Sequence, residues 1–326
     1  MKPTVAVLYG GRSAEHEISV RSARSVLEAI NRDKYDVCEI LITPEGKWKP
    51  GPILPEPGAN AGIDMVFPVL HGTFGEDGTI QGLLELAGLP YVGSGVLASS
   101  VAMDKEVAKR LCRERGLPVV DYVTVRRGRE LDEKTVREQL SYPVFVKPAN
   151  LGSSLGISKA ADFKQLAAAL SLAAEYDRKV LVERAIEGRE LECSVIGNDQ
   201  PLAAQPCEIL PSREFYDYED KYVLNRSRHR LPAELSGEKI AEVRGMAVAA
   251  YQAVECEGMA RVDFLLESGT DRLYINEVNT IPGFTSISMF PKMWEQAGVS
   301  CPELVDRLIE LAFERHRGRA ATRYTR

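Results

Sequence analysis

The chain has 326 residues, of which 44% are hydrophobic and 27% are charged, and these values are ordinary for a globular protein. Its net charge of -6 argues against a general binder of nucleic acid or of a membrane surface, although a local basic pocket for phosphate groups is compatible with it. The six cysteines form no C-x-x-C pair and no signal peptide is recognised, so we expect reduced thiols in a cytoplasmic protein without a structural zinc site.

A chain of this length exceeds the size at which one core usually keeps growing, so two or three packed units are expected. In residues 1–100, short apolar runs alternate with amphipathic stretches, which predicts an N-terminal unit built on a small parallel α/β layer. The uncharged stretch 86–103 contains Gly88, Pro90 and Gly93, so it is interpreted as loop and buried turn rather than as a membrane span.

Two polar segments follow apolar runs in this first unit. The segment YGGRSAEHE (9–17) could receive an anion on its backbone N–H groups, but it lacks the full G-x-G-x-x-G spacing, which disfavours a nicotinamide cofactor. Its Glu15 could hold a substrate ammonium or could simply be an acid at a helix N-terminus. The segment HGTFGEDGT (71–79) lies beyond a strand end, where ligands bind, and His71 is interpreted as fixing this loop rather than as a base.

A second unit is predicted over residues 101–187 and a third over residues 188–316. The elements expected in the second are a helix at 104–115, a strand at 144–147, a glycine-rich loop at 150–156, a helix at 162–175 and a strand at 180–183. Those expected in the third are a strand at 190–196, an irregular omega-type loop at 211–232, a helix at 238–254, strands at 259–266 and 272–278, and a helix at 302–314. The basic tail 317–326 is expected to be frayed and solvated.

The loop of the second unit combines a lysine with flexible glycines. Lys147 ends a strand just ahead of NLGSSLG, and such a lysine and loop suit a polyphosphate, although a surface hairpin would look similar. The loop does not have the Walker A pattern, so a different nucleotide fold is indicated. Glu183 and Glu190 lie at strand ends, where they could accept hydrogen bonds from an adenine amino group and ribose hydroxyls, or form exposed salt bridges.

The most informative residues lie on the last two predicted strands. Asp263, Glu277 and Asn279 are hard oxygen ligands of the type that magnesium takes. Glu277 and Asn279 are two apart on a strand and share a face, as do Arg261 and Asp263. So much charge on adjacent strands is costly without partners, so a bound metal and phosphates explain it better than a core does.

Seven motifs taken together resemble, in order and spacing, the D-alanine:D-alanine ligases of the ATP-grasp superfamily. They are YGGRSAEHEIS, HGTFGEDGTIQG, VKPANLGSSLG, ERAIEGRE, FYDYEDKY, RVDFLLE and NEVNTIPGFTSIS. The resemblance runs from about Val5 to about Ala312. It implies an α/β fold (α+β overall) with three-domain ATP-grasp architecture, and a cytoplasmic homodimer that joins two D-alanine molecules for peptidoglycan synthesis, with ATP and two Mg²⁺ (or Mn²⁺) ions.

The resemblance also implies roles for individual residues. The phosphates of ATP would be bound by Lys105, Lys147 and the loop that contains Ser154, with Lys221 at the transferred group, and the adenosine would be framed by Glu183, Arg184, Ile186 and Glu190. The two metal ions would be held by Asp263, Glu277 and Asn279. The substrates and the transition state would be bound by Glu15, Ser288, Arg261 and the backbone near Gly283, and a trio of Glu15, Ser153 and Tyr222 would link the domains.

The chain departs from the family pattern at two positions, and its motifs are compatible with three competing functions. Arg184 stands where many relatives have lysine, and Met289 follows Ser288 where leucine is common. A D-alanine:D-lactate or D-alanine:D-serine ligase would use the same scaffold, although Tyr222 beside Lys221 is typical of the dipeptide-forming type. A nucleotide-binding regulatory protein without turnover, or a carboxylating ATP-grasp enzyme that activates bicarbonate, would share the nucleotide site.

Overall fold

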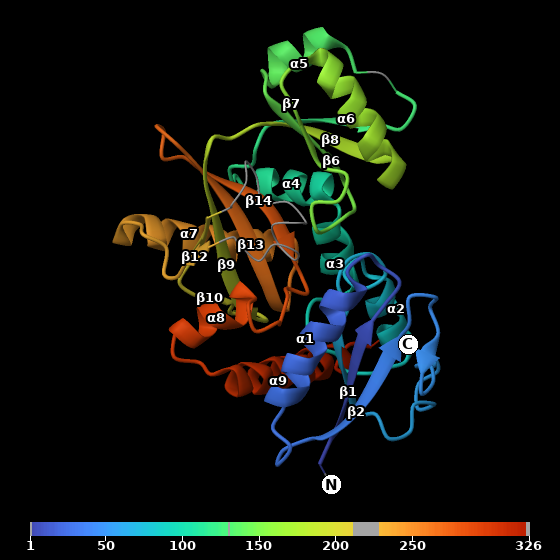
Figure 1. The fold of residues 1–326 in the computed structure, drawn as a ribbon. Coiled ribbons are helices and arrows are strands. Elements are labelled where there is room, and N and C mark those ends of the chain that lie inside the picture. Colours follow the sequence, from blue (N-terminus) through green and yellow to red (C-terminus); the bar gives the residue numbers. More distant parts are fainter. Residues whose placement is uncertain (1, 130, 211–227, 324–326) are drawn as a thin grey trace.

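The computed structural model describes residues 2–129, 131–210 and 228–323, which fold into three β-sheets with helices packed on and between them (Figure 1). The first sheet has the order β3-β2-β1-β4, with β1 parallel to both β2 and β4. This part of the chain contains β1 (Thr4–Gly10), α1 (His16–Ala29), β2 (Asp36–Ile42), β3 (Trp48–Lys49), β4 (Met65–Val69), α2 (Thr79–Leu86) and α3 (Val96–Met103). This confirms the predicted parallel α/β layer.

The second sheet has the order β5-β8-β6-β7 and is antiparallel. This part of the chain contains α4 (Lys105–Glu114), β5 (Tyr122–Arg126), α5 (Glu133–Gln139), β6 (Val144–Pro148), β7 (Ser158–Ala160), α6 (Phe163–Tyr176) and β8 (Lys179–Arg184). The two helices and two strands predicted here agree with α4, α6, β6 and β8 to within a few residues. In Figure 1, α5 and α6 cover one side of this sheet, while α4 lies between it and the third sheet.

The third sheet has the order β12-β11-β9-β13-β14, with the short β10 paired to β9. Its elements are β9 (Gly188–Gly197), β10 (Leu202–Ala203), β11 (Cys207–Leu210), β12 (Arg228–Arg230), α7 (Gly237–Ala253), β13 (Gly258–Glu267), β14 (Leu273–Asn279), α8 (Met289–Gln296) and α9 (Cys301–Ala320). Long antiparallel pairing of β13 with both β9 and β14 places the polar residues of three strands on one face.

Three sequence predictions need correction. The stretch 86–103 is not loop throughout, because α3 begins at Val96 after Gly95 and packs Ala98 and Ala102 into the interior. The predicted irregular loop 211–232 includes strand β12, which pairs with β11, while residues 211–227 lie outside the described residues. The basic tail is helical to Ala320 rather than frayed.

The C-terminal helix continues into the tail because its arginines find partners on the first unit. The Arg315 side chain is buried, donates a hydrogen bond to the Tyr91 carbonyl oxygen at 2.9 Å and lies over the Tyr91 ring. Arg319 pairs with Glu85. Charges that the sequence suggests are solvated therefore tie the last helix to α2 and to the segment that follows it.

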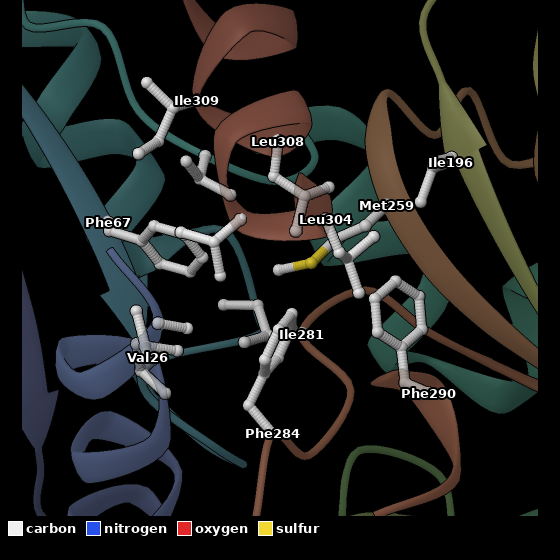
Figure 2. Packing of buried hydrophobic residues seen from close by; sticks show 14 of the residues in the cluster. Val26, Phe67, Ile196, Met259, Ile281, Phe284, Phe290, Leu304, Leu308 and Ile309 are labelled. Atoms are coloured by element: carbon white, nitrogen blue, oxygen red, sulfur yellow. The ribbon is translucent and has the colours of Figure 1, made fainter. Parts of the chain in front are cut away.

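A large apolar cluster joins the first sheet to the third (Figure 2). Phe67 of β4 and Val26 of α1 meet Leu304 and Leu308 of α9 in this cluster. Phe284, which lies between β14 and α8, projects into the same interior. Such a dry contact fixes the two sheets relative to each other, because separating them would expose these side chains to water. Within the described residues, no helix is both long and apolar enough to cross a membrane.

Candidate active site

Helix α4 carries two lysines on one face, one turn apart. The helix begins at Lys105 because the Asp104 side chain caps it, accepting from the Val107 backbone N–H at 3.1 Å. The Lys105 ammonium donates to the Leu151 carbonyl oxygen at 2.6 Å and lies 3.4 Å from a carboxylate oxygen of Glu277. Lys109, which the sequence interpretation did not single out, lies 3.2 Å from Glu183. The helix thus faces β14 and β8 at once.

Glu183, at the end of β8, lies between two ammonium groups. Its two carboxylate oxygens are 3.2 Å from Lys109 and 2.6 Å from Lys147, and the Lys147 ammonium also donates to the Asn276 side-chain oxygen at 3.2 Å. Burial by itself raises the pKa of Glu183, but the two lysines outweigh burial and hold that pKa below the usual glutamate value. The carboxylate is therefore ionised, although only 3% of the residue is exposed.

Glu183, Lys147 and Asn276 border a cavity of about 730 Å³ between the second and third sheets. All of the described residues to which the resemblance gives a role in ATP binding line it, namely Lys105, Lys147, Ser154, Glu183, Arg184, Ile186 and Glu190. The Arg184 guanidinium is engaged at the edge of this cavity, since it donates to Glu267 at 2.7 Å and to the Tyr274 hydroxyl at 3.0 Å. The volume suits a nucleotide, and the lysines supply the positive charge that phosphates need.

The candidate metal ligands lie on β13 and β14. In the antiparallel register Asp263 is opposite Glu277, and Arg261 is opposite Asn279, so the four side chains share one face as the period-two spacing predicts. The Asn279 amide nitrogen donates to an Asp263 oxygen at 3.0 Å. Arg261 donates two hydrogen bonds to Asp263, each 2.7 Å long. Burial raises the pKa of Asp263 to about 7, although the Arg261 charge acts in the opposite direction.

This donor set fits a divalent cation. Asp263 and Glu277 supply carboxylates, and Asn279 keeps its amide oxygen as an acceptor while its nitrogen is used. Among the described residues, no group of three or more His, Cys, Asp or Glu side chains is arranged to hold a metal. A cation here would take over the neutralisation of Asp263 that Arg261 performs in this structure.

The first unit reaches the glycine-rich loop through Glu15. The Ser153 hydroxyl donates a hydrogen bond to a Glu15 carboxylate oxygen. Ser153 and Ser154 both have positive φ, at 50° and 59°, a conformation that non-glycine residues seldom adopt and that the surrounding contacts must maintain. Gly152 comes so close to Glu15 that an added Cβ would lie 3.0 Å from a carboxylate oxygen. Two of the three residues in the predicted domain-linking trio therefore meet.

His71 fixes a loop, in agreement with its interpretation. Its Nδ1 lies 3.0 Å from the Ile281 carbonyl oxygen, which can only accept, so Nδ1 carries the proton and the neutral ring accepts at Nε2 from the Ser22 hydroxyl, also at 3.0 Å. The Ser22 oxygen in turn accepts from the Phe284 backbone N–H at 3.2 Å. Burial lowers the pKa of His71, consistent with a neutral ring. The chain of bonds holds residues 281–284 against α1.

Glu76 performs a similar task and was missed in the sequence. Its carboxylate accepts from the backbone N–H groups of Gly72 at 2.7 Å and Ile281 at 3.2 Å. Burial, together with the Glu15 charge, raises the pKa of Glu76 to about 8. The sequence shows only one more acid in a loop of polar residues, and the signal that sets it apart is its position four residues after Gly72, in reach of that N–H.

Gly283 and Ser288 lie in the segment between β14 and α8. The Ser288 hydroxyl accepts from the Thr285 backbone N–H at 3.0 Å. A Cβ on Gly283 would stand 2.8 Å from this hydroxyl, so any other residue there would force the Ser288 side chain or the backbone to shift. Within the part of the chain that the structure describes, the 730 Å³ cavity is not lined by Glu15, Arg261, Asn279, Gly283 or Ser288, which lie beyond its limits. Lys221 and Tyr222 fall outside the described residues.

Comparison with known proteins extends these observations over the whole chain. The family model described as D-ala D-ala ligase C-terminus matches residues 111–310, and the model described as D-ala D-ala ligase N-terminus matches residues 4–58 and 52–94. The D-alanine--D-alanine ligase of Solibacter usitatus is 66% identical, and the alignment covers 100% of both chains. That of Acetivibrio thermocellus is 47% identical and covers 97% of each chain.

Two solved structures superpose closely. The D-alanine-D-alanine ligase from Coxiella burnetii has a TM-score of 0.88 and 36% identity, with 98% of this chain and 96% of that chain covered. The VanG D-Ala:D-Ser ligase from Enterococcus faecalis also has a TM-score of 0.88, with 38% identity and coverage of 96% and 100%.

Proposed function

The chain belongs to the D-ala D-ala ligase family and has its ATP-grasp fold, and from this premise we propose that it joins two D-alanine molecules at the expense of ATP. The products are D-alanyl-D-alanine, ADP and phosphate, and the dipeptide serves peptidoglycan synthesis. One observation supports this proposal above all. A cavity of nucleotide size is bordered by Lys105 and Lys147 and by the β13–β14 carboxylates, with Arg261 beside them.

ATP occupies the cavity between the second and third sheets in this proposal. Lys105 and Lys147 bind the phosphates, because both ammonium groups reach the cavity and both are held by carboxylates that phosphates can replace. The loop with Ser153 and Ser154 closes over the phosphates. The adenosine is framed by Glu183, Arg184, Ile186 and Glu190. For Lys221 at the transferred phosphate and Tyr222 in the domain-linking trio, the proposal rests on the sequence.

Two Mg²⁺ ions, or Mn²⁺ ions, are proposed at Asp263, Glu277 and Asn279. When bound, such ions neutralise the charge on the phosphate oxygens. The chain itself provides the positioning, because the β13–β14 register holds the ligands on one face. Arg261, released from Asp263, then becomes available to the oxygens of the reacting groups.

The substrates are proposed to bind to Glu15, Arg261 and Ser288. Glu15 binds the ammonium of the first D-alanine, and the carboxylate of this D-alanine attacks the γ-phosphorus, so that ADP leaves and an acyl phosphate forms. The amine of the second D-alanine, whose carboxylate binds Ser288, then attacks the acyl carbon, loses a proton and expels phosphate. Arg261 and the N–H near Gly283 stabilise the developing negative charge on oxygen, so positioning and electrostatics supply most of the rate.

The organisation of the chain is part of the proposal. We infer domains at 1–100, 101–187 and 188–316, supported by the fact that each of the three sheets falls within one of these ranges. We also propose a homodimer that acts in the cytoplasm, where ATP is available. The chemistry proposed at the cavity does not depend on the homodimer or on the location.

The test is phosphate release from ATP and Mg²⁺ with D-alanine, with L-alanine as the matched control, and identification of products by mass. Formation of one ADP per D-alanyl-D-alanine, and none with L-alanine, is the expected result. Absence of D-alanine-dependent turnover refutes the proposal. A D-alanine:D-serine ligase is the second candidate, because the VanG structure superposes as well as that from Coxiella burnetii. D-serine and D-lactate offered in competition with D-alanine decide between them by the product formed.

A further inference from the structure

Lys109 is a buried charge that the proposed reaction does not use. It lies on α4 one turn after Lys105, and only 2% of its side chain is exposed. Unlike Lys105 and Lys147, it is absent from the described residues that line the 730 Å³ cavity. Its ammonium lies 3.2 Å from a carboxylate oxygen of Glu183. Lys109 therefore pairs with a residue that lines the cavity, but does not itself line it.

Glu183 has one ammonium partner on each side of that wall. One carboxylate oxygen faces Lys109, while the other lies 2.6 Å from Lys147, which does line the cavity. Lys147 has a second partner in the Asn276 side-chain oxygen at 3.2 Å. Only 3% of Glu183 is exposed, so its carboxylate depends on the two ammonium groups rather than on bulk water for neutralisation.

The arrangement matters when a polyphosphate enters. An incoming phosphate competes with Glu183 for Lys147, and without Lys109 the exchange would leave a buried carboxylate with no counter-charge, which is strongly unfavourable. With Lys109 in place, Glu183 keeps one ammonium partner and stays ionised. Burial lowers the pKa of Lys109 to about 8, even though Glu183 acts to raise it, so the amine still carries its proton at pH 7.

We propose that Lys109 is a positioning residue that neutralises Glu183 and thereby frees Lys147 to bind the phosphates of the nucleotide. This inference rests on the proposed use of ATP. It assigns no contact between Lys109 and the substrate. The residue acts through Glu183 and Lys147, so its loss should weaken nucleotide binding and should leave the binding of the amino-acid substrates unchanged.

The test compares Lys109→Met with Lys109→Arg by calorimetric titration with ATP and Mg²⁺. We expect Lys109→Met to raise the Kd for ATP about tenfold or more, equivalent to about 1.4 kcal/mol, with the KM for D-alanine within about twofold. Lys109→Arg keeps the charge and should stay within about threefold of the unaltered protein. The control is Lys239→Met. Lys239 is likewise a lysine in ion pairs, with Glu242 at 2.7 Å and Asp271 at 3.0 Å, and it does not line the cavity.

An ATP Kd for Lys109→Met within about twofold of the unaltered protein overturns the inference, and so does an arginine variant as weak as the methionine variant. If Lys109→Met yields no folded protein, Lys109→Gln carries the same expectation and is measured in the same way. The binding measurement does not require turnover. A protein that binds ATP but makes no D-alanyl-D-alanine therefore refutes the proposed function, while the Kd series still decides on Lys109.

Discussion

Phe284 links the first sheet to the segment that contains Ser288, and truncation of Phe284 to alanine tests that link. The residue is 1% exposed, and its ring centroid lies 6.2 Å from Phe67 in an edge-on arrangement and 5.5 Å from Phe290. These partners belong to β4 and α8, so a single side chain joins the first sheet to the helix after Ser288. Its backbone N–H donates to Ser22 at 3.2 Å, which adds a polar tie at the same point.

The expected loss in the free energy of unfolding follows from the packing around Phe284. Removal of a buried phenylalanine side chain costs about 3–5 kcal/mol when the surroundings do not collapse, and each lost aromatic pair contributes about 0.5–1.5 kcal/mol. We therefore expect Phe284→Ala to lower the free energy of unfolding by about 4 kcal/mol. Phe284→Leu keeps most of the volume and should cost about 1 kcal/mol. Because Gly283 precedes Phe284, the KM for the second D-alanine should also rise in the alanine variant.

Urea unfolding followed by the fluorescence of Trp294 measures the effect, because Trp294 is 5% exposed and lies in the same apolar cluster. A local reporter is needed since a chain with several units need not unfold in one step. With a slope of about 3 kcal/mol/M, the expected loss moves the midpoint by roughly 1 M or slightly more. A shift below about 0.3 M, or equal shifts for the alanine and leucine variants, would refute the packing argument.

Three further changes test the site and its support. Gly283→Ala places a Cβ 2.8 Å from the Ser288 hydroxyl and should raise the KM for the second D-alanine about tenfold. Gly82→Ala is the control, because an added Cβ there has nothing within 4 Å, and it should leave that KM unchanged. Equal kinetics of the two variants would contradict the close approach. Ser153→Ala removes the hydrogen bond to Glu15 and should raise the KM for the first D-alanine roughly tenfold, and a rise confined to ATP would contradict this. Hydrogen bonds from Arg189, at 2.6 and 2.8 Å, hold the pKa of Glu208 below its usual value despite burial. The ionised form of Glu208 therefore stabilises the fold above about pH 4.3, and this contribution is lost as the pH falls through the lowered pKa. Glu208→Gln should therefore lower the urea midpoint at pH 7 and converge with the unaltered protein in acid, and a constant difference at both pH values would disprove the assignment.

The sequence by itself determined what depends on local periodicity. Strands predicted at 259–266 and 272–278 occur as Gly258–Glu267 and Leu273–Asn279, and the shared face of Glu277 and Asn279 follows because side chains alternate along any strand. The lysine and glycines at residues 147–156 likewise predict a phosphate loop from the chemistry of the segment itself, and Lys147 and Ser154 both line the cavity, but phosphate binding stays a prediction. The family resemblance rested on such local motifs, and the comparisons confirm it.

Only the tertiary structure decided which charges are buried and with what partners. Lys109 looks like any lysine on an amphipathic helix until β8 brings Glu183 against it, and Glu76 looks like a solvated loop acid until Ile281 supplies an N–H. Arg315 lies just past the end of the last predicted helix, yet it is buried against Tyr91. In each case the partner lies far away in the chain, so desolvation and pairing, which set the role of an ionisable group, arise only when the sheets pack together.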